Sequence, residues 1–500
     1  MPDPSQPAAS ATQIVYPVTT RAFGLAIIVL SGLQLMVVLD GTVANLALAP
    51  LQADLGLSDA GRNWVLTSYA LAFGGLMLLG GRLGDAFGRK RMFLGGVVLF
   101  TVASLLCGLA VNEGTLVAAR ALQGVGAAVA SPTAFALVAT TFAPGPVRNQ
   151  AIAIYAAMTG VGSIAGLIIG GALTQVSWRW IFLINVPIGI VIAILAVVSL
   201  KETEGVRLTL DFPGAILGTL GCTGVVLALS EGTELGWLSP VVVGALIAGL
   251  VLLGLFLFVE RRADNPLLPF SLFADKNRVA TFVAIFFAGG VMFCLAAFVA
   301  LFVQDILGYS PLAAGMAFVP FAFGLGAAAF ITSQLVVRIQ PRWLVMAGAA
   351  IMVGWLLVSV TTMDADSSYF PGIFFPVIGI GFGVGMASIP LPLCAIAGVP
   401  ATEIGPLTAI ALVAQTLGGP VALAIVGALV TSRTLSLGGT TGPARLMNDI
   451  QLGALSSGYM FALFCCAICA VVAGVSAYFI RFTPQQVAQA QAAQEDAQSS

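Results

Sequence analysis

Fourteen long apolar stretches run through this 500-residue sequence, and most of them contain no charged side chain. A helix needs about 20 mostly apolar residues to cross the hydrocarbon core of a membrane. Within that core, a helix satisfies every backbone polar group inside its own segment. The stretches lack the alternation of polar and apolar residues that a membrane β-barrel requires. The sequence therefore predicts an all-α polytopic membrane protein.

The predicted spans follow one another along the chain with polar connections between them. The twelfth stretch is interrupted by Pro390 and Pro392, so its end is the least regular. The fourteen spans cover residues 22–49, 62–80, 92–111, 115–140, 150–173, 179–200, 212–230, 238–259, 279–303, 311–335, 343–362, 371–397, 403–430 and 457–480.

Composition supports this class and argues against several functions. Hydrophobic residues make up 59% of the chain and charged residues 8%, whereas soluble domains carry about 25% charged residues. No basic tract suggests binding to nucleic acid, and a chain without histidine is a poor candidate for a zinc site. Cys466 and Cys469 form a CxxC pair, but they lie in an apolar run, which favours packing over a redox or metal role. We expect no cofactor.

The first 20 residues are polar and rich in Pro, Ser and Ala, which is typical of a disordered tail. A signal peptide is an alternative interpretation of residues 21–49, because Ala47-Leu48-Ala49 resembles a cleavage site. The segment is longer than the usual apolar region of a signal peptide, and it contains Asp40. A first membrane span is therefore the favoured interpretation.

Lysine and arginine are distributed unevenly between the loops. With the N-terminus in the cytoplasm, fifteen of them fall on the cytoplasmic side, and four fall outside: Arg62, Arg179, Arg433 and Arg445. Loops on the cytoplasmic side of a membrane carry an excess of these residues. We therefore predict a multi-pass protein of the cell membrane with an even number of spans and both termini in the cytoplasm.

The two ends of the chain match in span layout when one is shifted by about 252 residues. Repeated halves around a site at the membrane midplane are a common plan of secondary transporters. The predicted organisation is a disordered cytoplasmic tail, a six-helix bundle, two extra helices with their linkers, a second six-helix bundle, and a cytoplasmic tail. These parts cover residues 1–20, 21–200, 201–278, 279–481 and 482–500.

The loop after the second span carries the sharpest local pattern. Its glycines permit a tight turn and a close approach of helices, and Asp85 is placed to cap a helix or to meet a cation. The pattern is more specific than a positively charged cytoplasmic turn requires. The residues that form it are Gly81, Gly84, Asp85, Gly88, Arg89 and Lys90.

Four further stretches accompany this loop: residues 39–48, 63–69, 120–126 and 178–187. Together with the loop, they resemble the major facilitator superfamily, and more closely its fourteen-span drug:proton antiporter branch, over about residues 21–480. The resemblance implies two six-helix bundles with two additional central helices. The resemblance gives almost no information on the identity of the substrate.

The resemblance also implies roles for individual residues. The Asp85 loop would act as a cytoplasmic latch between the two halves and would help to hold the outward-facing state. Asp40 in the first span would handle protons or cationic substrate. Arg120 in the fourth span would take part in proton transfer.

Asp40 and Arg120 are also unusual on physical grounds. A charge at the centre of a membrane span costs about 2.5–3.5 kcal/mol on insertion scales, which indicates function. Two alternatives remain open. Arg120 lies near the end of its span and could extend its head to the interface, and Asp40 could be a carboxylate near the end of a longer first helix.

A carboxylate at membrane depth offers a route to proton coupling. Burial disfavours the charged form of such a group. Protonation of Asp40 would remove a negative charge from the cavity, and a cationic or polar substrate would then leave. A proton that moves down the membrane potential supplies about 2.3 kcal/mol per 100 mV to such an exchange.

Gly162, Gly166 and Gly170 recur every four residues in the fifth span, and Gly171 is adjacent. This spacing predicts a face of small residues against which another helix packs closely. The antiporter motif of the family reads Gly-Pro-x-x-Gly-Gly here, but Leu167 stands in place of the proline. The helix kink that a proline causes is then not expected, and the inference of antiport over symport is weaker.

Gln304 and Asp305 lie at the outer end of the ninth span, where they are candidates for a cavity or an outer gate. An ordinary loop acid is the alternative for Asp305. Aromatic and methionine side chains in the spans, such as Phe321, Phe323 and Met386, face either an apolar cavity or lipid and core.

These observations favour a monomeric, proton-coupled exporter of small amphipathic or cationic compounds that works by alternating access. Proton-coupled uptake by the same fold is the first alternative. An enzyme or a channel is a remote one, because the sequence shows neither a nucleophile with its base, a metal cluster or a phosphate loop, nor a filter motif.

Overall fold

The computed structural model describes residues 21–142, 146–202, 211–262, 273–336, 338–363, 369–399 and 401–486. The predicted N-terminal tail and most of the predicted C-terminal tail lie outside these ranges. Fourteen helical segments in the described residues are long and apolar enough to cross a membrane. Each corresponds to one predicted span, so the predicted fold class is confirmed.

The first six spans come from seven helices. The sixth span is divided at Ile184 into a short helix and a longer one. Gly88 adopts a positive φ of 98° at the corner between the second and third helices, a conformation that favours glycine. The helices are α1 (Arg21–Leu55), α2 (Asp59–Phe87), α3 (Arg89–Gly108), α4 (Glu113–Thr141), α5 (Pro146–Val176), α6 (Trp180–Leu183) and α7 (Asn185–Ser199).

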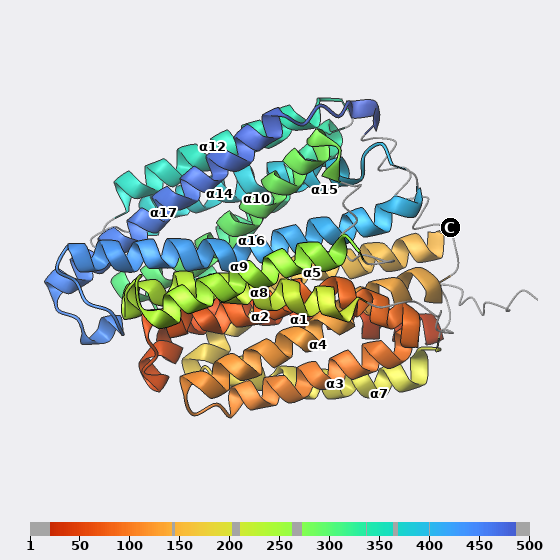
Figure 1. Cartoon of the computed structure of the whole chain (residues 1–500), viewed down its shortest axis with the longest axis horizontal. Helices are drawn as coiled ribbons and strands as arrows, with labels where there is room; N and C mark the ends of the chain where they lie inside the picture. Colours follow the sequence, from red (N-terminus) through yellow and green to blue (C-terminus); the bar gives the residue numbers. More distant parts are fainter. Residues whose placement is uncertain are drawn as a thin grey trace, which may run out of the picture.

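Two further spans, α8 (Phe212–Leu235) and α9 (Pro240–Glu260), form a hairpin. They lie across the middle of the molecule in Figure 1, in lime green. Asp211 caps α8 by accepting a hydrogen bond from the Gly214 amide. On its other side α8 contacts both α2 and α16, so the hairpin packs along the line where the two halves meet.

The last six spans make up the second half, drawn from green to blue in Figure 1. The predicted interruption of the twelfth span is present, because the helix breaks at Ile389, directly before Pro390. The elements are α10 (Lys276–Leu301), the π-helix η2 (Phe302–Ile306), α11 (Pro311–Leu335), α12 (Pro341–Thr362), α13 (Tyr369–Gly372), α14 (Phe374–Ser388), α15 (Pro390–Ile396), α16 (Ala401–Ser436), the 3₁₀-helix η3 (Ala444–Leu446) and α17 (Asp449–Tyr478).

The two halves pack in the same way. Pairs α1–α5, α2–α4 and α3–α7 in the first half correspond to α10–α16, α11–α14 and α12–α17 in the second. The halves meet through α2–α16 and α5–α11. This matched packing agrees with the repeat inferred from the span layout. We call the end that carries residues 437–448 the outer end, after the orientation predicted from the loop charges.

Candidate functional site

The two charges predicted at membrane depth form an ion pair inside the first half. Asp40 lies in the middle of α1, and Arg120 lies in the second turn of α4. The Arg120 Nη1 atom is 2.6 Å from Asp40 Oδ2, and each side chain is only 1% exposed. The predicted charges therefore neutralise each other in a dry part of the helix bundle.

Two amide side chains complete the shell of the Asp40 carboxylate. Gln123 Nε2 and Asn185 Nδ2 each donate to Asp40 Oδ1 over 2.8 Å. Gln123 also donates to Ser104 Oγ over 2.7 Å and accepts a hydrogen bond from Arg120. Spans one, three, four and six thus share one buried polar network. Charge-assisted hydrogen bonds of this kind are about twice as strong as neutral ones.

The guanidinium of Arg120 is held from several sides. Its Nε atom donates to the Val65 carbonyl over 2.9 Å. The Tyr69 ring lies 4.3 Å from its central carbon, and the Phe182 ring lies 5.5 Å away. Aromatic faces attract a cation most strongly when water is excluded. These contacts fix the position of Arg120 at the end of α4 that lies near the outer side.

The structure excludes the two alternatives raised for these charges. Arg120 does not extend to the membrane surface, because its side chain is 1% exposed. Asp40 is not near a helix end, because α1 continues without interruption to Leu55. The alternative interpretation of residues 21–49 as a signal peptide would place its cleavage point within this same buried helix.

Sequence reasoning did not single out Ser104, Gln123 or Asn185. Gln123 follows Arg120 by three residues, so the two side chains share one face of α4. Asn185 lies in the segment 178–187 that carries part of the family resemblance. A buried amide in an otherwise apolar span was therefore a usable signal.

The predicted cytoplasmic latch forms the corner between α2 and α3. Asp85 accepts from Arg89, with 2.8 Å between Oδ1 and Nη2. Lys90 Nζ donates to the carbonyls of Val197 and Leu200 at the end of α7. The predicted loop is mostly helical, because α2 continues to Phe87 and only Gly88 separates it from α3. Gly81 and Gly84 therefore lie in α2, where they face Pro132 and Thr133 of α4. All these contacts stay within the first half.

The glycines of α5 pack against two different helices. A Cβ atom on Gly162, Gly166 or Gly170 would meet Val38, Thr42 or Val43 of α1, respectively. Gly171 instead faces the second half, where an added Cβ would lie 2.6 Å from Leu312 Cα in α11. The expected face of small residues is present for the first three glycines. Gly171 is part of the contact between the halves.

The outer end of this contact is closed. Gln175 Nε2 of α5 donates to Ser310 Oγ of the second half over 3.0 Å. Arg445 of η3 donates to the Ala53 carbonyl in α1. The amide of Gly442 donates to Asp59 over 3.4 Å. These hydrogen bonds join the two halves on the outer side of Asp40.

Gln304 and Asp305 lie in the π-helix η2, at the same outer end. Gln304 is turned back along its own helix and donates to the Ala300 carbonyl over 3.2 Å. Asp305 accepts a hydrogen bond of 2.8 Å from the Tyr459 hydroxyl in α17. Asp305 is therefore not an ordinary exposed loop acid, since it is half-buried and bound to another span.

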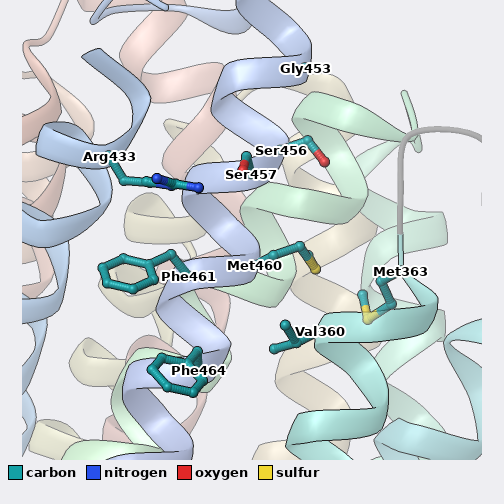
Figure 2. Close-up of a pocket in the computed structure, with 9 residues that line it drawn as sticks. All are labelled: Val360, Met363, Arg433, Gly453, Ser456, Ser457, Met460, Phe461 and Phe464. Carbon is teal, nitrogen blue, oxygen red and sulfur yellow. The ribbon is translucent and has the colours of Figure 1, made fainter. Parts of the chain in front are cut away.

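Two pockets lie in the second half. An open pocket of about 520 Å³ lies between α12, α16 and α17, with Arg433 at one side and Phe461 and Phe464 below it (Figure 2). A closed apolar pocket shares Met363 with it and includes Phe321. Neither pocket includes Asp40. Phe323, by contrast, lines neither pocket and is 72% exposed.

Known proteins with similar sequences are transporters. The chain is 53% identical over 476 residues to the "Uncharacterized MFS-type transporter EfpA" of Mycobacterium tuberculosis, covering 95% of this chain and 90% of that protein. It is 40% identical over 422 residues to the "Puromycin resistance protein pur8" of Streptomyces alboniger, covering 83% and 82%.

The fold is also similar to a solved structure. A bacterial homologue of the human lysosomal transporter Spinster, in an inward-facing and unoccupied conformation, matches with a TM-score of 0.68 at 17% identity. The match covers 94% of this chain and 99% of that one. Residues 30–423 match the Major Facilitator Superfamily. This chain therefore belongs to the major facilitator superfamily.

Proposed function

We propose that this protein exports small amphipathic or cationic compounds across the cell membrane in exchange for protons. The buried Asp40–Arg120 pair carries this proposal, because ionisable groups at membrane depth mark proton and ion pathways. The name of the Streptomyces relative, a puromycin resistance protein, supports export over uptake. We expect the cytoplasm to be on the side of the Asp85 loop and of both termini.

The geometry changes the mechanism expected from the sequence. Asp40 does not face an open cavity here, since Arg120, Gln123 and Asn185 surround its carboxylate. A proton added to Asp40 in this arrangement would leave Arg120 buried without a counter-ion, which is strongly destabilising. Protonation of Asp40 must therefore accompany a rearrangement of the network. This linkage would connect proton binding with the change from one facing state to the other.

The closed outer end fits one extreme of an alternating-access cycle. Transport then requires that the hydrogen bonds between Gln175 and Ser310 and between Gly442 and Asp59 break. In that opposite state the Asp85 loop would act as the latch on the cytoplasmic side. Here its ion pair with Arg89 stays inside the first half, as expected of a released latch.

A resistance profile tests this function. The chain would be expressed in a bacterial host that lacks its own major efflux pumps, and growth would be measured against chemically diverse toxic cations and neutral amphipathic compounds. We expect resistance to several such compounds with the parent chain. We expect none with Asp40→Asn, at equal protein levels in the membrane. Equal resistance in both strains would remove Asp40 from the mechanism.

A further inference from the structure

Arg433 differs from the other three basic residues that the loop charges place on the outer side. Arg62 donates to a glutamine of the first half, Arg179 forms an ion pair, and Arg445 donates to a backbone carbonyl. Arg433 lies in the last turn of α16 and is exposed. Within the described residues, its guanidinium has neither an ion-pair nor a hydrogen-bond partner. One positive charge at the outer end is therefore available to a ligand.

Arg433 stands at one side of the open pocket between α12, α16 and α17, which has a volume of about 520 Å³. Figure 2 shows its side chain at the level of Ser457, with Phe461 and Phe464 below it. Ser456 lines the pocket beside Ser457. Neither hydroxyl makes a hydrogen bond within the described part of the chain, so both are free to donate one. The polar groups of the pocket thus gather at its outer level.

The pocket opens on the side of α17 that faces away from the helix bundle. Below the serines, exposed apolar side chains recur every three or four residues, which places them on one face of the helix. These residues are 40–56% exposed: Phe464, Ile468, Val471 and Val475. Tyr459 and Cys466, on the opposite face, are 1% exposed. Apolar side chains that stay exposed along a membrane span face hydrocarbon. The pocket therefore opens toward lipid.

The order of chemical groups along the span matches that of a phospholipid. The guanidinium of Arg433 and the serine hydroxyls lie at the outer level, and Met460, Phe461 and Phe464 follow toward the membrane interior. The helix rises about 10 Å between Ser457 and Phe464. A guanidinium binds phosphate oxygens through two parallel hydrogen bonds. The charge thus selects an anion, and the apolar wall selects an anion that carries a hydrocarbon chain.

We propose that this pocket binds an anionic phospholipid of the leaflet at the outer end. The phosphate would lie between Arg433 and the hydroxyls of Ser456 and Ser457, and an acyl chain would follow Phe464 along α17. The site is separate from Asp40, which lines neither pocket. The proposal goes beyond the proposed function, because it concerns the protein in its membrane and holds for any exported compound.

Lipid binding to the purified full-length protein tests this proposal. The protein would be freed of lipid in a neutral detergent and titrated with phosphatidylglycerol, which is anionic. A separate titration would use phosphatidylcholine, which has no net charge, with the same acyl chains. Native mass spectrometry reports how many lipid molecules each protein molecule holds. We expect the parent to hold at least one phosphatidylglycerol molecule at concentrations where phosphatidylcholine does not bind.

Arg433→Gln should remove one phosphatidylglycerol molecule from the parent and weaken its binding by at least about fivefold, the usual contribution of one basic side chain near a membrane surface. Arg433→Lys keeps the charge without the paired donors and should retain part of the binding. Ser457→Phe fills the pocket without changing any charge and should remove the same lipid. Arg179→Gln, a matched change of an outer arginine that is already paired with Asp54, should leave the lipid bound.

Three results would overturn the proposal. If the parent and Arg433→Gln hold the same number of phosphatidylglycerol molecules, Arg433 holds no lipid; neutralisation by residues 364–368, which contain two aspartates and lie outside the described residues, would give this result. If inorganic phosphate displaces the lipid at equal concentration, the pocket recognises only an anion. If a compound from the resistance profile displaces it, the pocket belongs to the transport path. The resistance profile judges the proposed function independently of these measurements.

Discussion

Asp40 of α1 and Arg120 of α4, 80 residues apart in the sequence, form an ion pair of 2.6 Å with each side chain only 1% exposed. A buried pair of this kind is weak support for stability, because removing both charges from water is costly. The pair is sensitive, however, to a change in the charge of one partner. The loss of either charge leaves the other buried and unpaired.

Asp40→Asn should therefore destabilise the protein as well as stop export. The unpaired Arg120 should cost about 3–5 kcal/mol, which is the usual effect of breaking a buried pair. The measurement is the melting temperature of the purified protein in detergent. Asp54→Asn is the matched control, because its pair with Arg179 is 36–51% exposed and contributes at most about 1 kcal/mol.

The double variant Asp40→Asn/Arg120→Gln separates stability from function. It removes both charges, so we expect most of the lost stability to return while export stays absent. If the stability losses of the two single variants add up to the loss of the double variant, the two residues do not act as a pair.

Asn185→Ala should weaken the same network from the sixth span. It removes one donor from the Asp40 carboxylate, at a cost of about 1.5–3 kcal/mol for a hydrogen bond to a charged group. Asn45→Ala is the control, since Asn45 donates to the Gly41 carbonyl of its own helix over 3.0 Å. Export rates and melting temperatures would be compared for both variants. Equal losses in the two would contradict a particular role for Asn185.

Gly171→Ala should open the outer end. An added methyl group would lie 2.6 Å from Leu312 Cα, and overpacking of this kind costs about 1–3 kcal/mol. That energy corresponds to roughly a 5- to 150-fold change in the ratio of closed to open molecules. Gln175→Cys and Ser310→Cys place two thiols where the native side chains are 3.0 Å apart across the contact between the halves, and the yield of a short thiol cross-link between them reports this ratio. Gly160→Ala in the same helix has free space around it and should leave the cross-link unchanged.

Asp85→Asn should have the opposite effect, if the loop acts as a latch in the outward-facing state. Loss of that latch should favour the closed outer end, by up to about 1 kcal/mol if the latch is one partly exposed ion pair. The same cross-link should therefore rise by up to about fivefold. Arg91→Gln breaks a pair of 3.5 Å with Glu202 in the same region and serves as the control. An unchanged cross-link and unchanged transport in Asp85→Asn would exclude the latch.

The fold was predictable because hydrocarbon imposes a strong and simple pattern on a sequence. Twenty apolar residues with few charges identify a span without any knowledge of its neighbours. Asp40 and Arg120 were identified for the same reason, since a charge in such a span is conspicuous. That these two residues pair was not predictable, because pairing depends on how α1 and α4 are rotated in the bundle.

Charges at the span ends were harder to interpret. Arg62 was counted with the outer loops, yet its side chain is 4% exposed, because α2 begins three residues earlier and meets the second half there. Gly171 was grouped with three glycines that face α1, although successive residues in a helix point about 100° apart. Both cases concern which surface a residue faces. That surface is set by contact between the halves, which leaves little trace in local sequence.

The most direct test of the account is proton movement caused by the exported compound. Everted membrane vesicles would be acidified inside, and a compound from the resistance profile would be added outside while a dye reports luminal pH. We predict that the compound releases protons from vesicles that contain the parent chain, and that it releases none from vesicles with Asp40→Asn. Uptake of the compound into the vesicle lumen without any proton release would contradict proton-coupled export.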